Sequence, residues 1–210
     1  TVDGVNLDPA PGFYEGDVRI TVCDNFTRES LRFGEKTISD YRAGAIVSDG
    51  QIVQNSSVTA MFRGGVVNDT FAKDFKLESR EWDVNGFYIT GNTEYTIENG
   101  DITLVGDGTD NFVGMGAAIA AAGNAKVTIN NTKVSCKGIG RGTLFAGDNS
   151  VVTMNDCDFS AYADEPTLEE LAKGKEMERM MEPPWAIGLR GNVRTLNLAG
   201  SAVLSVNRSH

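Results

Sequence analysis

Four side chains in the second half of the sequence have the types needed for acid–base chemistry on a sugar ring. A cation such as Lys137 or Arg141 could stabilise the carboxylate and developing enolate of a uronic acid while Tyr162 removes the α-proton. Asp158 could share acid and base duties with a second carboxylate in glycoside hydrolysis. The predicted catalytic residues are therefore Lys137, Arg141, Asp158 and Tyr162, and solvated surface charge is the alternative for the three charged residues.

Two further residues could bind such a substrate. Trp185 offers an aromatic face for ring stacking, and Arg190 offers a second cation. Both follow a segment near 167–181 that opens with the capping box Thr167–Glu170 and stops before Pro183–Pro184, which predicts a short helical insertion. This insertion is either a surface loop or one wall of a binding cleft.

The elements that position these residues follow from an internal repeat. Residues 123–131 (GNAKVTINN) match residues 148–156 (DNSVVTMND) at a shift of 25 positions, and residues 200–208 repeat the pattern. Residues 92–99 are a looser copy upstream. Apolar residues alternate in each copy, so each is predicted to be a strand with one buried face.

A second short strand is expected after two of these copies, at 133–136 and 158–161. Glycines are expected to form the positive-φ corners between strands, namely Gly138, Gly140, Gly142 and Gly147. Stacked copies place like residues in ladders, such as Asn130 over Asn155. The repeat therefore predicts an all-β right-handed parallel β-helix, a solenoid whose units are too small to fold alone.

The V-T-I-N-N and V-T-M-N-D strands with glycine corners resemble the pectin-lyase-like right-handed parallel β-helix superfamily over roughly residues 85–210. That superfamily contains polysaccharide lyases, glycoside hydrolases, epimerases, phage tailspikes and adhesins, so the resemblance implies a fold and an extracellular setting rather than one activity. The sequence shows no catalytic signature of a named lyase family.

Residues 1–84 are less repetitive and are predicted to form an N-terminal β cap with the first strands, and residues 85–210 are predicted to form the coils. Within the cap, 17–23 alternates as a strand, and 45–53 reads as a hairpin that turns at Asp49–Gly50.

At the other end, the last copy begins at Gly200 and His210 follows before its coil would close. We therefore expect the coils to be completed by a second chain produced by proteolytic processing, by another subunit of a homo-oligomer, or by a missing C-terminal part.

Composition limits the partners. The formal net charge is -10 and the pI is about 4.6, which disfavours nucleic acid or an anionic membrane as a ligand. No stretch reaches the roughly 20 apolar residues that a membrane span needs. The chain begins at Thr1 rather than Met, which fits removal of a signal peptide, although a trimmed start would look the same. We therefore expect a secreted or cell-surface protein.

The three cysteines, Cys23, Cys136 and Cys157, have no metal-binding spacing and are expected to be buried, with Cys157 the one candidate for a reactive thiol. The single histidine, His210, cannot by itself form a metal site or a Ser-His-Asp triad.

Two short segments have features of cofactor or metal sites. Gly114–Ala120 superficially matches the start of a dinucleotide fingerprint, but such a site needs a full helix after the glycines, and Gly123–Asn124 would end any helix quickly. Residues 107–111 are predicted to be a turn, with a calcium site as the alternative, and Asp156 with Asp158 could form a carboxylate pair on one strand face. Apart from Ca²⁺, no cofactor is predicted.

The function indicated by these features is an extracellular lyase, hydrolase or isomerase that acts on a polysaccharide, glycoside or related ring-bearing molecule in a groove along the solenoid. The alternative is a non-catalytic surface adhesin or structural scaffold. An enzyme should gather acidic, basic and aromatic side chains in one groove, whereas an adhesin should show flat polar ladders.

Overall fold

The computed structural model describes residues 36–138, 140–162 and 193–210. They belong to one compact unit, Lys36–His210. Strands dominate, and helix in the described residues is limited to three short 3₁₀ turns, η2 (Ile38–Asp40), η3 (Gln54–Ser56) and η4 (Thr59–Met61). The predicted all-β class is confirmed, and no helix in this part of the chain is long and apolar enough to cross a membrane.

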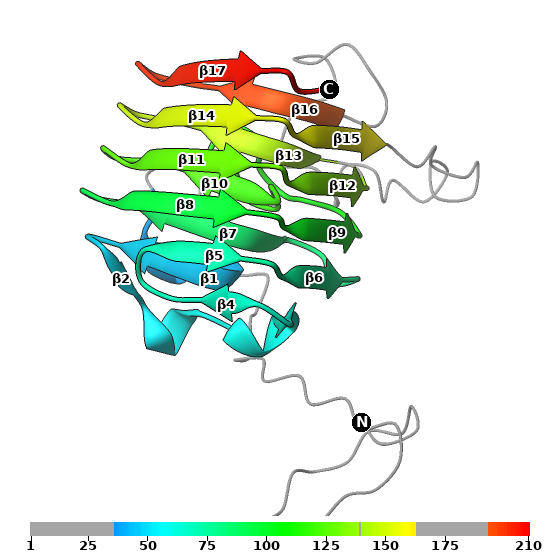
Figure 1. The fold of residues 1–210 in the computed structure, drawn as a ribbon, viewed down its shortest axis with the longest axis horizontal. Helices are drawn as coiled ribbons and strands as arrows, with labels where there is room; N and C mark the ends of the chain where they lie inside the picture. The colour runs from blue at the N-terminus through cyan, green and yellow to red at the C-terminus, as the bar shows by residue number, and fades with distance from the viewer. Residues whose placement is uncertain (1–35, 139, 163–192) are drawn as a thin grey trace, which may run out of the picture. The chain divides into compact units, whose positions relative to one another are not determined.

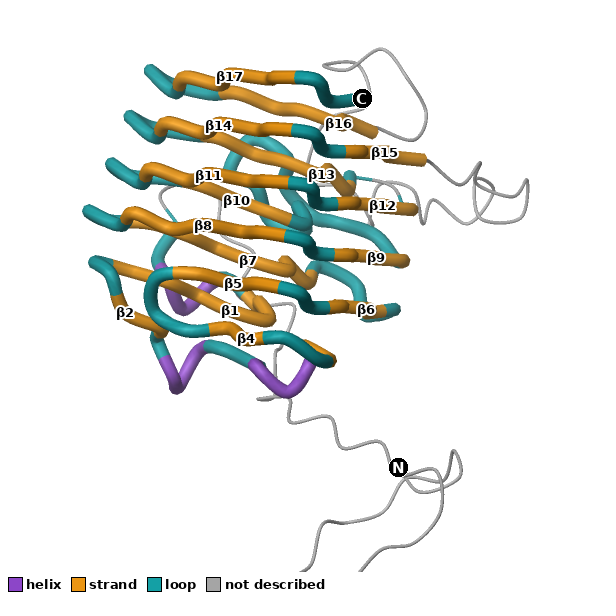
Figure 2. The backbone as a smooth tube through the Cα atoms, in the orientation of Figure 1, coloured by secondary structure: helices purple, strands orange, loops and turns teal. Residues whose placement is uncertain are grey.

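The strands form three sheets (Figures 1 and 2). In chain order they are β1 (Arg42–Ser48), β2 (Gln51–Ile52), β3 (Phe62–Arg63), β4 (Val66–Val67), β5 (Phe71–Lys73), β6 (Lys76–Ser79), β7 (Val84–Thr90), β8 (Glu94–Glu98), β9 (Asp101–Val105), β10 (Ile119–Ala121), β11 (Lys126–Asn130), β12 (Lys133–Lys137), β13 (Arg141–Ala146), β14 (Val151–Asn155), β15 (Asp158–Tyr162), β16 (Val193–Leu198) and β17 (Val203–Asn207). The first sheet has the order β16-β13-β10-β7-β1-β2, the second β17-β14-β11-β8-β5-β4, and the third β15-β12-β9-β6-β3.

The sequence copies are equivalent strands of the second sheet. β11 pairs with β14 in parallel, with Val127 opposite Val152, which is the predicted alignment. The same alignment places Tyr95 of β8 opposite Val127 and Leu204 of β17 opposite Val152. All four copies are thus confirmed as strands, and β12 and β15 confirm the second strand that follows two of them.

The spacing of the repeat varies because segments are inserted between strands. Asn130 and Asn155 are 25 positions apart, whereas Glu94 and its neighbour Lys126 are 32 apart. The 32-residue interval between β8 and β11 contains turns after β9, including the predicted turn at 107–111. Gly114–Ala120 runs through such a turn into strand β10 rather than into a helix, so the structure contradicts a dinucleotide site there.

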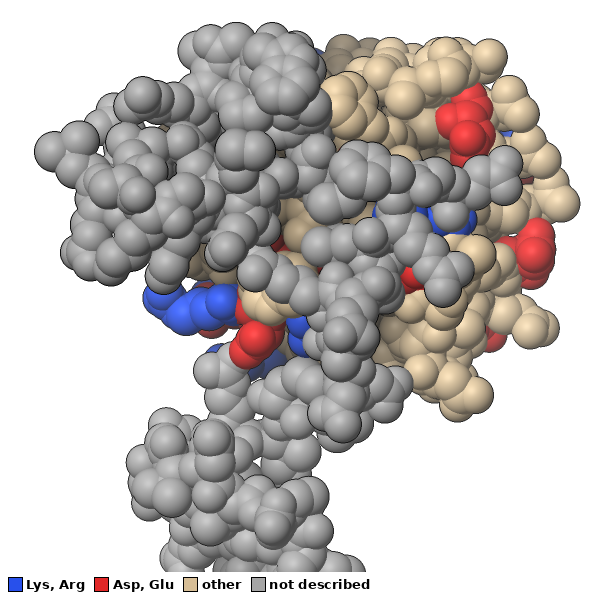
Figure 3. Space-filling model, turned by 180° about the vertical axis from the view of Figure 1, so that it is seen from behind, with Lys and Arg blue, Asp and Glu red and all other residues tan. Residues whose placement is uncertain are grey.

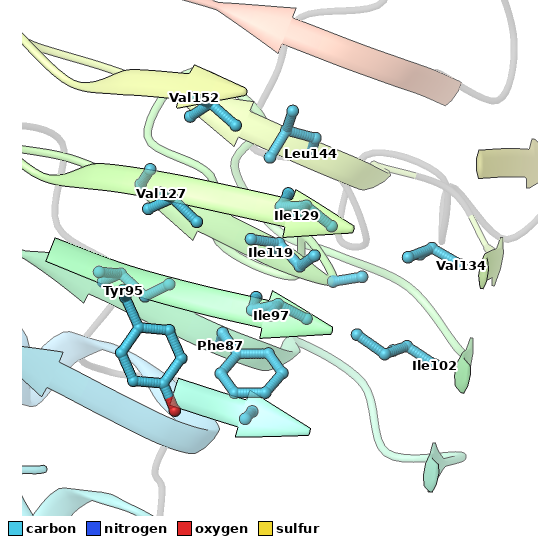
Figure 4. Close-up of a cluster of buried hydrophobic side chains, with 14 of the residues drawn as sticks. Phe87, Tyr95, Ile97, Ile102, Ile119, Val127, Ile129, Val134, Leu144 and Val152 are labelled. Carbon is cyan, nitrogen blue, oxygen red and sulfur yellow. The ribbon is translucent and has the colours of Figure 1, made fainter. Parts of the chain in front are cut away.

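The core lies between the three sheets, because alternate residues of the second and third sheets point inward. Figure 4 shows these side chains meeting those of the first sheet, with Phe87 and Ile119 facing Ile97, Ile129 and Ile102. Each of these five residues is fully buried. Burying one such side chain contributes about 1.5–3 kcal/mol, so the stacked inner columns supply the main stabilisation.

Asparagines form a ladder along the second sheet, as the repeat predicts. Asn155 donates its Nδ2 hydrogen to Oδ1 of Asn130 at 2.9 Å, and Asn207 donates to Oδ1 of Asn155 at 2.9 Å. Each side-chain amide therefore donates a hydrogen bond to the amide oxygen on the preceding strand. These bonds favour the observed register of the strands.

The strands nearest the N-terminal end of this unit pair differently. β1 and β2 form the predicted hairpin, with Asp49 (φ 50°) and Gly50 (φ 76°) in its turn. β3 with β6 and β4 with β5 are also antiparallel. Such short antiparallel strands blunt a sheet edge.

The glycine corners were predicted correctly at two of four positions. Gly138 (φ 148°) and Gly140 (φ 67°) have positive φ. Gly142 lies inside β13, and neither it nor Gly147 has positive φ. A side chain at Gly147 would meet the Phe145 ring at 2.7 Å, so this glycine provides room rather than a left-handed corner.

Some predicted features lie outside the described residues. They are the strand at 17–23, Cys23, the helical insertion near 167–181, and the predicted substrate-binding residues Trp185 and Arg190.

Candidate functional site

Three of the four predicted catalytic residues lie on the outer face of the third sheet. Lys137 ends β12 and Tyr162 ends β15, and the two residues are register partners. Both are exposed, Tyr162 by 57%. Asp158 is exposed at the other end of β15, four residues and therefore about 13 Å along the strand from Tyr162. The structure thus brings Lys137 and Tyr162 together but places Asp158 apart from them.

Arg141, the fourth predicted catalytic residue, does not reach the surface. Its side chain is fully buried, and its guanidinium donates hydrogen bonds to five backbone carbonyls. The acceptors are the carbonyl oxygens of Glu81, Val84, Gly106, Asp107 and Gly116. Arg141 therefore ties the turns after β9 to the strands beside them, and we correct its assignment from a cleft residue to a structural one.

Asp83, which the sequence did not single out, lies near Arg141. Its Oδ1 accepts a hydrogen bond from the Thr109 hydroxyl at 2.5 Å, and its Oδ2 has no partner within the described part of the chain. Burial raises the pKa of this carboxyl to about 6, although Thr109 and the positive charge of Arg141 act in the opposite direction. Nothing in the local sequence marks Asp83 as buried, because it precedes the strand whose alternation could be read.

The carboxylate pair expected at Asp156 and Asp158 does not form on one strand face. β14 ends at Asn155, and Asp156 has a left-handed backbone (φ 54°) in the bend before β15. Its carboxylate pairs with Arg208 at 2.7 Å, which lowers its pKa. The prediction that Asp156 and Asp158 share one strand face was wrong, because the strand does not continue through the bend.

Cys157, the one candidate for a reactive thiol, is buried and contacts backbone carbonyls of Ile129 and Asn155. Burial raises its pKa, and it also raises the pKa of Cys136 to about 12. A raised pKa keeps a thiol protonated and unreactive, so both cysteines act as small core residues.

The charges on the outer face of the third sheet alternate rather than converge. Register pairing places Lys76, Asp101, Lys133 and Asp158 in one column across four strands. Opposite charges on neighbouring strands attract one another. The ion pair of Lys76 is made within its own strand, with Glu78 at 2.7 Å, and the column as a whole alternates in charge without converging on one point. Figure 3 shows the molecule from behind the view of Figure 1. Acidic and basic side chains are interspersed there as well, among the described residues that are visible.

The outer face of the second sheet carries a different pattern, a row of hydroxyl side chains. We define the hydroxyl row as Thr96, Thr128, Thr153 and Ser205, which are register partners on four adjacent parallel strands. Adjacent strands lie about 4.8 Å apart, so the row spans about 14 Å. Within the described residues, none of these four hydroxyls makes a side-chain hydrogen bond. Ser205 is exposed, and the three threonines are half-buried.

An aromatic ring continues the row at one end. Phe71 of β5 is the register partner of Thr96, and it is 36% exposed. An open hollow of about 430 Å³ lies at this end of the sheet. Its lining residues are Thr70, Phe71, Ala72, Lys73, Thr96 and Glu98. The hollow thus places an aromatic face next to hydroxyl and charged groups.

Charged residues beside the hydroxyl row are paired with one another. Lys73 contacts Glu98 at 2.7 Å on one side of the row, and Lys126 contacts Glu94 at 2.8 Å on the other. The hydrogen bond from Lys126 lowers the pKa of the Glu94 carboxyl. The charges of these two ion pairs cancel. The face beside the row is therefore polar without a net charge from these four residues.

No group of three or more potential metal ligands occurs in the described ranges, which include the turn at 107–111 and the bend at Asp156. Comparison with known proteins finds no matching protein-family model, no matching curated protein and no matching solved structure.

Proposed function

We propose that this chain is a right-handed parallel β-helix of the secreted or cell-surface type, and that the outer face of its second sheet binds a neutral carbohydrate polymer without catalysis. The observation that carries the proposal is the hydroxyl row with Phe71 at its end. It is the flat polar ladder expected of an adhesin or scaffold.

Topology supports the β-helix. Each pass of the chain through β7–β9, β10–β12 and β13–β15 adds one strand to every sheet in the same order, and the strands added are parallel to their predecessors. Connections between parallel strands of one sheet are right-handed in about 98% of cases. The antiparallel strands within 36–84 support the cap at one end.

The chemistry of the face supports a sugar ligand. Hydroxyls both donate and accept hydrogen bonds, as sugar hydroxyls do, and the asparagine ladder beside the row adds amide groups. Phe71 offers an exposed ring against which the apolar face of a sugar can pack. The balanced charge beside the row favours a neutral polymer, and the net charge of -10 disfavours a polyanion.

The alternative, an enzyme of lyase type, is supported by one specific observation. Lys137 and Tyr162 are adjacent, exposed register partners, and Tyr162 directly precedes the segment that contains Trp185 and Arg190. Proton abstraction by Tyr162 beside a cation would fit β-elimination on a uronic acid. Substrate binding by Trp185 and Arg190 stays a prediction.

Pull-down on insoluble neutral polysaccharides tests the proposal. The double substitution Thr128→Val and Thr153→Val keeps shape and strand propensity while it removes two hydroxyls, and Phe71→Ala removes the ring. We expect the wild type to bind and both variants to lose most of that binding. The matched control is Lys137→Ala with Tyr162→Ala, which leaves the row intact and should bind as the wild type does.

Two results would overturn the proposal. One is binding that survives the hydroxyl and Phe71 substitutions but fails in the Lys137 and Tyr162 control. The other is release of unsaturated sugar products from a uronic acid polymer, lost in that same control, which would establish the enzyme instead.

A further inference from the structure

The hydroxyl row and Phe71 follow one another across the strands of the second sheet. Phe71, Thr96, Thr128 and Thr153 are register partners in turn, on β5, β8, β11 and β14. Figure 1 shows β8, β11 and β14 stacked with little rotation between neighbours. Neighbouring strands lie about 4.8 Å apart, so the row offers one contact group at each such step.

The register of this face is supported by the asparagine ladder beside the row. Asn155 donates to Oδ1 of Asn130 at 2.9 Å, and these residues lie two positions after Thr153 and Thr128 on their strands. Sheets with little twist are typically stabilised by such side-chain ladders. The row is therefore straight, which fits an extended ligand better than a coiled one.

The spacing of the row matches the repeat of one class of polysaccharide. A pyranose ring linked through equatorial bonds at carbons 1 and 4 advances the polymer by close to one strand spacing. A chain of such rings is a straight ribbon, whereas an axial bond at carbon 1 makes the chain curve. A straight ribbon along the row would place one ring over each strand, and a curved chain would leave the row within a few rings.

The columns on either side of the row suit the edges of such a ribbon. Residues two positions apart on a strand lie about 6.7 Å apart, so a ring lying flat on the row points its equatorial hydroxyls at the flanking side chains. Glu94 and Glu98 flank Thr96 on β8. Lys126 and Asn130 occupy the same two columns on β11. Carboxylates accept hydrogen bonds and ammonium groups donate them, so both edges of the ribbon meet groups that bind hydroxyls.

The hollow at Phe71 offers the largest contact along the row. Lys73 and Glu98 line it, pair with each other at 2.7 Å, and have side chains that are 45% and 35% exposed. A ring placed there would pack its apolar face on Phe71 and hydrogen-bond to both charged groups through neighbouring hydroxyls. Short ligands should therefore occupy this end of the row first.

We infer that the ligand of the hydroxyl row is a straight polymer of 1,4-linked pyranose rings with equatorial linkages, which runs across the strands with one ring to each strand, beginning on Phe71. This inference rests on the carbohydrate binding proposed above. It specifies the linkage of the polymer, its direction on the sheet and the register of its rings.

Isothermal titration calorimetry of the 210-residue chain with two matched series of oligosaccharides tests the inference. Both series contain two, three or four glucose rings joined between carbons 1 and 4, and the linkage at carbon 1 is equatorial (β) in one series and axial (α) in the other. We expect the affinity of the β-linked series to rise about three- to tenfold with each added ring, because each ring gains one hydrogen-bonding position. The α-linked series should bind weakly and gain little from length.

Two substitutions remove the same hydroxyl at different distances from Phe71. Thr96→Val should weaken the binding of two-ring and four-ring β-linked ligands alike, by about three- to tenfold. Thr153→Val should weaken the four-ring ligand by a similar factor and leave the two-ring ligand unchanged. Thr103→Val is the matched control, because Thr103 holds the central outward position of β9 in the third sheet and lies outside the row. It should leave every affinity unchanged.

The inference is overturned, while the proposed function stands, if the α-linked series binds as tightly as the β-linked series or if affinity does not rise with length. It is also overturned if Thr153→Val weakens the two-ring and four-ring ligands equally, because the rings would then not follow the strands in order. Failure of every oligosaccharide to bind, together with no binding in the pull-down, would refute the proposed function itself and this inference with it.

Discussion

Replacing Asp83 by asparagine should change how the stability of this fold depends on pH. The Asp83 side chain is buried, and burial raises its pKa from 3.8 to about 6. A carboxyl whose pKa is raised on folding binds its proton more tightly in the folded state. It therefore contributes stability that is fully present below pH 3.8 and lost as the pH rises through 6.

The size of the effect follows from the shift. A difference of roughly two pKa units corresponds to about 3 kcal/mol of unfolding free energy in total, of which about 2.4 kcal/mol is lost between pH 4 and pH 7. Asparagine does not titrate, so Asp83→Asn removes this contribution. Its Oδ1 can still accept the hydrogen bond from the Thr109 hydroxyl, so the local geometry is kept.

Urea unfolding followed by far-ultraviolet circular dichroism, at a series of pH values from 4 to 7, measures this effect. The relevant quantity is the difference in unfolding free energy between wild type and Asp83→Asn, because exposed carboxylates such as Asp156 contribute equally to both proteins. We expect that difference to move in favour of the variant as the pH rises. A difference that stays constant across the range would refute the account of Asp83 as a buried group with a raised pKa.

Three further predictions concern the core and its ladders. Arg141→Met should destabilise the fold by about 3–5 kcal/mol, measured by urea unfolding, because it leaves buried carbonyls without donors; a loss below 1 kcal/mol would contradict the structural role. Asn155→Ala should cost about 1–2 kcal/mol by removing two ladder hydrogen bonds, and a neutral effect would show that the ladder does not stabilise the sheet. Cys136 and Cys157 should resist a thiol reagent in the folded protein and react after denaturation; rapid labelling of either in the native state would contradict their burial.

Strands were predictable from the sequence because alternation and repetition report on the same physical constraint. A strand with one face in a core must alternate, and an equivalent strand stacked on it must repeat that alternation. This reasoning located β8, β11, β14 and β17 and the hairpin at Asp49–Gly50. The residues of the hydroxyl row occupy the central outward position of the same copies. That they form one continuous row becomes evident only when the four strands are aligned in register.

Side-chain direction outside regular strands was not predictable. Arg141 begins β13, where a basic residue would ordinarily face solvent, and its burial depends on carbonyls contributed by distant turns. Asp156 was misplaced because the bend after Asn155 interrupts the period of two. Such positions depend on tertiary contacts that no local pattern encodes.

Sugar binding by the hydroxyl row is tested most directly by nuclear magnetic resonance of the isotope-labelled chain during titration with a soluble neutral oligosaccharide. The account predicts that the backbone amide signals of Phe71, Thr96, Thr128 and Thr153 shift together and saturate at one affinity. Shifts confined to the third sheet, at Lys137, Asp158 and Tyr162, would contradict it and would favour the enzyme.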